Sequence, residues 1–146
     1  MCVFQSSAFC RPKETPLDTH DAFYKRLSRF PRVSLDAAKK IVAEAVVYAR
    51  ANNAPGGAIA VVDAGGYLMG LQRLDGVATI SSEIAPAKAR TAALGRRESK
   101  IYEDIINAGR YSFLSAPTLQ GMLEGGVPIL KDGLCIGAVG VRSEER

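Results

Sequence analysis

The chain of 146 residues is 47% hydrophobic and 23% charged, a composition that is typical of one globular domain with a buried core. Its net charge is +4, but residues 1–33 hold six basic and three acidic residues, and residues 34–146 hold thirteen and twelve. The second part is therefore nearly neutral and lacks the basic and aromatic stripe of a nucleic-acid-binding protein. No apolar run approaches the roughly 20 residues of a membrane span. We therefore expect neither nucleic acid nor a membrane as partner.

The three cysteines, Cys2, Cys10 and Cys135, are an odd number at unrelated spacings. This pattern argues against a disulfide framework or a zinc site and favours a reducing, cytoplasmic location. The first ten residues have neither a basic start nor a long apolar stretch, which argues against a secretory signal.

Residues 1–33 are expected to form an N-terminal extension with one short helix. Residues 1–17 are polar and interrupted by prolines, so we expect them to be irregular. Residues 20–30 have the periodicity of a helix, which Pro31 ends. The apolar residues of this helix share one face: Phe23, Leu27 and Phe30.

The domain of residues 34–146 is expected to begin with a longer helix. Ser34 suits the N-cap position, and an Asn-Asn pair closes the helix. Its buried stripe is expected to consist of Ala38, Ile41, Val42, Ala45 and Ala49. The nearly all-apolar residues 58–63 then predict a buried strand, which a glycine turn joins to an antiparallel strand over residues 67–73.

The second half of the domain changes to a helical pattern at Ser82, with small residues on one face that allow close packing on a sheet or another helix. That face consists of Ala85, Ala89, Ala92 and Ala93. A short helix over residues 99–108 and an irregular segment over residues 111–126 follow. Residues 127–131 and 134–141 flank an Asp-Gly pair, a strong hairpin signal. Two hairpins with helices around them predict an α+β domain with an antiparallel sheet.

The order of these motifs resembles that of one protein family. From about Ser34 to Val141 a helix is followed by VVDAGGYL, RLDG, SSEIAPAKARTAAL, GGVPI, DG and IGAVGV, as in the GlcG/HbpS family. Some members of that family bind haem, and many have no assigned chemistry. The resemblance implies a profilin-like antiparallel sheet of about five strands with helices on its faces. It also implies homo-oligomers, from dimers to octamers.

The chain departs from the family pattern at both ends. Members usually follow the last strand with a Ser-Gly-Gly turn and a C-terminal helix, and this sequence has neither after Val141. It has the N-terminal extension instead, which holds the only histidine, His20. A missing helix leaves apolar surface exposed, at a cost of about 25 cal/mol per Å². We therefore expect the helix of residues 19–30 to cover that surface, on its own domain or on a neighbouring subunit.

By the resemblance, a pocket is bordered by residues 73–76, the helix that carries Lys88, and residues 125–128. Lys88 borders the apolar stripe of its helix. Its ammonium group either lies along the surface without a function, or points into the pocket to bind a carboxylate or polarise a carbonyl. We take Lys88 as the principal catalytic candidate and expect it to face one cavity together with Arg73, with glycines in the cavity wall.

The other candidates also have two interpretations. Arg73 and Asp75 either form a solvated turn or hold an acidic ligand, which Asp75 orients or exchanges a proton with. Glu83 is favoured in the first turn of a helix by the helix dipole alone, and is also a catalytic candidate. Gly125 and Gly126 either provide the positive φ that the backbone needs where the strand begins, or present their amides to a carboxylate.

The sequence lacks the residues that several kinds of catalytic chemistry require. The domain has no histidine, so no Ser-His-acid set can form inside it. No cluster of His and Cys offers catalytic metal ligands, and no phosphate loop or dinucleotide fingerprint is present. We therefore expect neither a metal site nor a nucleotide cofactor.

Three functions remain open, of which the first is an enzyme without a cofactor. Lys88, Asp75 and Glu83 would perform acid–base chemistry on a small acidic or carbonyl compound. Isomerisation, dehydration and hydrolysis all suit these groups. Arg73 would bind the substrate together with Tyr111 and the two glycines.

The second function is haem binding, and the third is a non-catalytic ligand-binding or assembly module. Basic side chains would hold the haem propionates, and the iron would need an axial ligand. The candidates for that ligand are Tyr111, Met122, Cys135 and His20.

Overall fold

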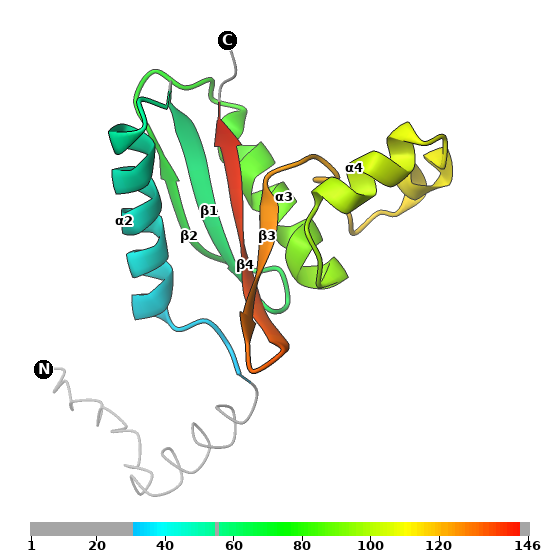
Figure 1. The fold of residues 1–146 in the computed structure, drawn as a ribbon, viewed down its shortest axis with the longest axis horizontal. Helices are drawn as coiled ribbons and strands as arrows, with labels where there is room; N and C mark the ends of the chain where they lie inside the picture. Colours follow the sequence, from blue (N-terminus) through cyan, green and yellow to red (C-terminus); the bar gives the residue numbers. More distant parts are fainter. Residues whose placement is uncertain (1–30, 55, 144–146) are drawn as a thin grey trace, which may run out of the picture. The chain divides into compact units, whose positions relative to one another are not determined.

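The computed structural model describes residues 31–54 and 56–143, and Pro31–Arg146 forms one compact unit. The helix expected over residues 20–30 lies outside the described residues, so it stays a prediction. The described part contains three α-helices, one 3₁₀-helix and four strands (Figure 1). Their bounds are α2 Leu35–Ala51, β1 Gly57–Asp63, β2 Leu68–Arg73, α3 Ser81–Gly95, α4 Lys100–Asn107, η1 Tyr111–Ser115, β3 Gly126–Lys131 and β4 Leu134–Ser143.

The four strands form one sheet in the order β2-β1-β4-β3, with every neighbouring pair antiparallel. β1 and β2 form one hairpin, β3 and β4 form the other, and pairing of β1 with β4 joins them. Both predicted hairpins and the α+β class are thereby confirmed. The described residues form four strands, where the resemblance implied about five.

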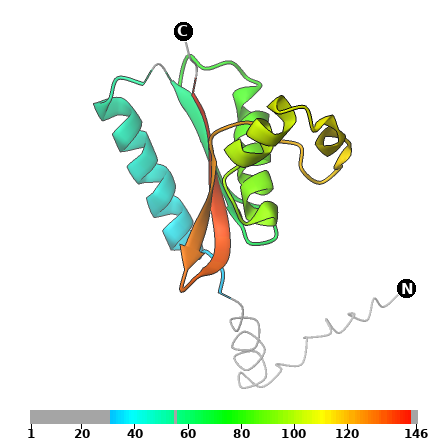
Figure 2. The same ribbon diagram turned by 45° about the vertical axis from the view of Figure 1, so that its right-hand side comes forward.

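α2 covers one face of the sheet (Figure 2). Ser34 caps it as predicted, because the Ser34 hydroxyl accepts a hydrogen bond from the Ala37 amide at 3.2 Å. Its buried residues pack with Ile59 and Val61 of β1 in one apolar cluster. α2 lies over β1 and β2. On the same face of β4, Val141 stays 38% exposed.

α3 covers the opposite face of the sheet (Figure 2). Ala58 and Ala60 of β1 pack with Ala85, and Val62 packs with the alanines further along α3. The predicted small-residue face is confirmed, since its four alanines are at most 2% exposed. The helix begins at Ser81, one residue before the predicted start.

The close approach of α3 to the sheet depends on a glycine in β4. A Cβ atom built on Gly140 would collide with the carbonyl oxygen of Ala85. The small residues of α3 and the missing side chain of Gly140 together allow the helix backbone to contact β4 directly.

The segment expected to be irregular contains the short helix η1, and Gly126 already belongs to β3. Within the described ranges, no helix has the length and apolar character that crossing a membrane requires.

We predict that Gly140→Ala lowers the free energy of unfolding by about 1–3 kcal/mol, because the added methyl group overpacks the α3 interface. Gly70→Ala in β2 is the matched control, since its Cβ would meet only Val42 Cγ2, at 3.8 Å. Urea unfolding of the two variants measures the difference. Equal stability of both variants would show that α3 does not pack tightly on β4.

Candidate functional site

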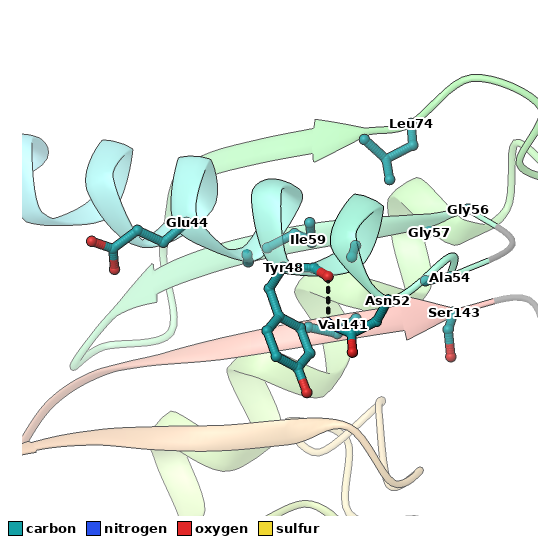
Figure 3. Close-up of a pocket in the computed structure, with 12 residues that line it drawn as sticks. Glu44, Tyr48, Asn52, Ala54, Gly56, Gly57, Ile59, Leu74, Val141 and Ser143 are labelled. Carbon is teal, nitrogen blue, oxygen red and sulfur yellow. Dashed lines mark hydrogen bonds between the residues drawn. The ribbon is translucent and has the colours of Figure 1, made fainter.

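A pocket of about 560 Å³ lies beside the C-terminal half of α2, and we call it the apolar pocket (Figure 3). Most of its lining residues are apolar. They are Glu44, Ala45, Tyr48, Ala49 and Asn52 of α2, Ala54, Gly56, Gly57 and Ile59 at the start of β1, and Leu74, Val141 and Ser143. A pocket of this size and character suits a small apolar molecule.

The apolar pocket follows from the way α2 covers the sheet. Ala45 and Ala49 of α2 are small, and the helix lies over β1 and β2 rather than over β4. The half-exposed Val141 of β4 therefore forms part of the floor next to Ile59, with which it is in register.

Tyr48 is the largest side chain in the wall of the apolar pocket. It extends from α2 across β4, and it is 72% exposed (Figure 3). The side-chain amide of Asn52, one turn further along α2, donates a hydrogen bond to the Tyr48 carbonyl oxygen at 2.8 Å. This bond caps the C-terminal end of α2.

A second pocket of about 520 Å³, which we call the polar pocket, adjoins the first at the end of α2. Its lining includes the polar residues Arg50, Gln72, Arg73 and Asp75. Ala54, Gly56 and Leu74 line both pockets. Two guanidinium groups and one carboxylate leave a local charge of +1, which favours an anionic group.

Lys88 lies on the other face of the sheet, in α3. It is only 5% exposed, and its ammonium group donates a hydrogen bond to the Val141 carbonyl oxygen at 3.2 Å. A Cβ atom on Gly125 would come within 3.2 Å of the same ammonium nitrogen. The backbone of Gly126 lies against the Lys88 carbonyl group. The structure thus brings Lys88 together with both glycines of the expected site.

Arg73 and Asp75 do not join that group. Arg73 ends β2, which is one edge of the sheet, whereas Gly126 begins β3, which is the other edge. Two strands lie between them, and adjacent strands are about 4.8 Å apart. Lys88 and Arg73 therefore lie at two separate positions and do not face the single cavity that was expected. Arg73 and Asp75 line the polar pocket, and Lys88 is buried against β4.

Glu83, Tyr111 and Cys135 lie outside both pockets. Glu83 is exposed in the first turn of α3, and Tyr111 is 66% exposed at the start of η1. The thiol of Cys135 is half-buried and donates to the carbonyl oxygens of Ala93 and Gly137. Among the described residues, no three His, Cys, Asp or Glu side chains gather to hold a metal ion.

Sequence reasoning missed the α2 side of the site. Ala45 and Ala49 were expected to belong to the buried stripe of α2, but they line the apolar pocket. Tyr48 and Arg50 lie beside that stripe and were not among the residues singled out from the sequence. An aromatic residue at the edge of a helical stripe of small residues was the signal available.

We predict that Lys88 is needed for stability rather than for binding. Lys88→Ala removes the hydrogen bond to Val141 and leaves a void between α3 and β3, so we expect a loss of about 2–4 kcal/mol in the free energy of unfolding. Lys100→Ala is the control on an exposed helix position, where a hydrogen bond to Asp104 raises the pKa of Lys100. Thermal and urea unfolding measure both variants. An unchanged stability of Lys88→Ala would contradict a structural role.

Two sequence comparisons place the chain among known proteins. The family model described as "Haem degrading protein HbpS-like" matches residues 33–145. Protein GlcG of Escherichia coli K12 is 58% identical over 83 residues, which are 57% of this chain and 61% of GlcG. The matched part thus spans about three-fifths of the length of this curated relative.

Solved structures show the same architecture. The crystal structure of protein ORFY from Klebsiella pneumoniae has a TM-score of 0.73 at 25% identity, covering 80% of this chain and 81% of ORFY. The PduOC:Heme complex has a TM-score of 0.66 at 25% identity, covering 78% of this chain and 84% of PduOC. Since the family model matches well over half of the sequence, this chain belongs to the HbpS-like family.

Proposed function

We propose that the chain binds haem, with the tetrapyrrole in the apolar pocket and its propionates in the polar pocket. The observation that carries the proposal is the shared wall of the two pockets, formed by Ala54, Gly56 and Leu74. The apolar walls thereby adjoin a pocket whose lining includes two arginines. The family description and the haem complex of PduOC support the same ligand.

The described residues fit the chemical parts of haem. A flat apolar ring gains free energy by leaving water, at about 25 cal/mol per Å² of buried apolar surface. Arg50 and Arg73 are both exposed, and each presents a planar fork that matches a carboxylate. Bound haem would supply the redox chemistry of iron, while these residues would hold and orient the ring.

The enzyme hypothesis is less well supported by the same geometry. It requires Lys88, Asp75 and Glu83 around one substrate. Asp75 lines the polar pocket, Lys88 is buried on the far face of the sheet, and Glu83 is exposed on α3. The arginines of the polar pocket support one part of that hypothesis, the binding of a small acidic ligand.

Homo-oligomers and a cytoplasmic location, both expected from the sequence, stay proposals. Apolar side chains that are more than half exposed on the β3–β4 hairpin support self-association: Leu130 at 60% and Leu134 at 56%. Exposed apolar surface of this kind marks interaction sites.

We predict that haemin binds and that the Arg50→Gln, Arg73→Gln double variant binds it about tenfold more weakly, because the propionates lose their cationic partners. Ala49→Glu, which places a carboxylate in the apolar pocket, should reduce binding further. Titration followed by Soret absorbance gives the affinities.

Two matched variants control for general effects of charge. Ala43→Glu adds the same carboxylate to an exposed position of α2, and Arg110→Gln removes an arginine outside both pockets. Both should bind haemin as the unmodified chain does. Equal weakening by the control and pocket variants, or no spectral change at all, would contradict the proposed site.

A further inference from the structure

We infer that the phenolate oxygen of Tyr48 is the axial ligand of the haem iron. The inference rests on the proposed function and adds the residue that would contact the metal. It also gives a chemical preference, since an anionic oxygen ligand favours ferric over ferrous haem.

Tyr48 lies in the wall of the apolar pocket, where it can contact the iron. Ferric haem is held in proteins by His, Cys, Met or Tyr side chains. Of the residues that line the apolar pocket, Tyr48 is the one with such a side chain. It stands on the α2 wall, and its exposed ring reaches across β4 beside Val141 (Figure 3).

The second argument concerns the alternatives expected from the sequence. Cys135 donates its thiol hydrogen to carbonyl groups of α3 and β4, and it does not line the apolar pocket. Tyr111 lies in η1, and Met122 lies in the segment before β3, both outside the pocket lining. His20 lies outside the described residues.

The third argument is the surroundings of Tyr48 on α2. Ala45 and Ala49 are small, so a flat ring can approach the helix without meeting a bulky side chain. Glu44 and Asn52 lie one turn before and after Tyr48 and line the same pocket. The Glu44 carboxylate is exposed and paired with Lys40 at 3.8 Å, so we take the Tyr48 phenol rather than this carboxylate as the iron ligand.

The ligation step is balanced without a change of oxidation state. The O–H bond of the Tyr48 phenol breaks, its proton passes to solvent, and the phenolate oxygen forms a bond to ferric iron. The neighbouring arginines of the polar pocket take no part in this step. In the proposed complex they hold the propionates.

The test compares two porphyrins on the full chain and on the Tyr48→Phe variant. Metal-free protoporphyrin IX reports the pocket alone, and haemin reports pocket and iron ligand together. We expect Tyr48→Phe to bind protoporphyrin IX with unchanged affinity and to bind haemin about tenfold or more weakly. The phenolate-to-iron charge-transfer band and the iron–phenolate resonance Raman modes of the unmodified complex should disappear.

Two further variants make the result specific. Tyr111→Phe removes an equally exposed phenol outside the pocket and should leave the haemin spectrum unchanged. Tyr48→His should restore tight haemin binding with the spectrum of an imidazole ligand. Because Tyr48 is mostly exposed, the melting temperatures of its variants should match that of the unmodified chain.

The outcomes separate this inference from the proposed function. Haemin affinity and spectra that are identical in the unmodified chain and in Tyr48→Phe, with protoporphyrin IX bound by both, would overturn the role of Tyr48 and leave haem binding standing. If the unmodified chain binds neither porphyrin, both the role of Tyr48 and the proposed function are wrong.

Discussion

The two-sided burial of β1 is the constraint on which the rest of the domain depends. Its side chains alternate between the two faces of the sheet, as strand geometry requires. Ala58 and Ala60 face α3, and the larger Ile59 and Val61 face α2. The small side allows α3 to pack in direct contact with the sheet, and the large side holds α2 away from it. The apolar pocket accordingly lies on the α2 face of the sheet.

The same asymmetry places the Lys88, Gly125 and Gly126 group of the expected site at a contact between α3 and the start of β3. Close packing of α3 brings Lys88 against the start of β3, where a side chain at Gly126 would collide with the Lys88 carbonyl group. The Gly126 amide donates instead to the Ser99 hydroxyl at 2.8 Å. The glycines before β3 thus permit backbone contact with α3. We propose that their clustering with Lys88 serves the packing of this helix, as the Lys88→Ala variant tests.

Local patterns predicted the elements well, and the site depended on contacts that local patterns do not contain. The Asp132-Gly133 turn was predictable because an Asp-Gly pair readily adopts the positive φ that a two-residue hairpin requires. In the structure the two residues have φ of 52° and 77°. The apolar pocket joins residues almost a hundred positions apart, from Glu44 to Ser143. Its walls exist only after β1 pairs with β4, so neither periodicity nor motif order could place Tyr48 beside Val141.

We propose that the ligand lies on the α2 face of the sheet. Paramagnetic broadening of backbone amide signals by ferric haem measures its position directly. We expect broadening of residues 44–52 together with the amides around Leu74 and Val141, while the amides around Tyr111 and Lys131 stay sharp. Broadening centred on η1 or on the β3–β4 turn, with residues 44–52 unaffected, would contradict the account.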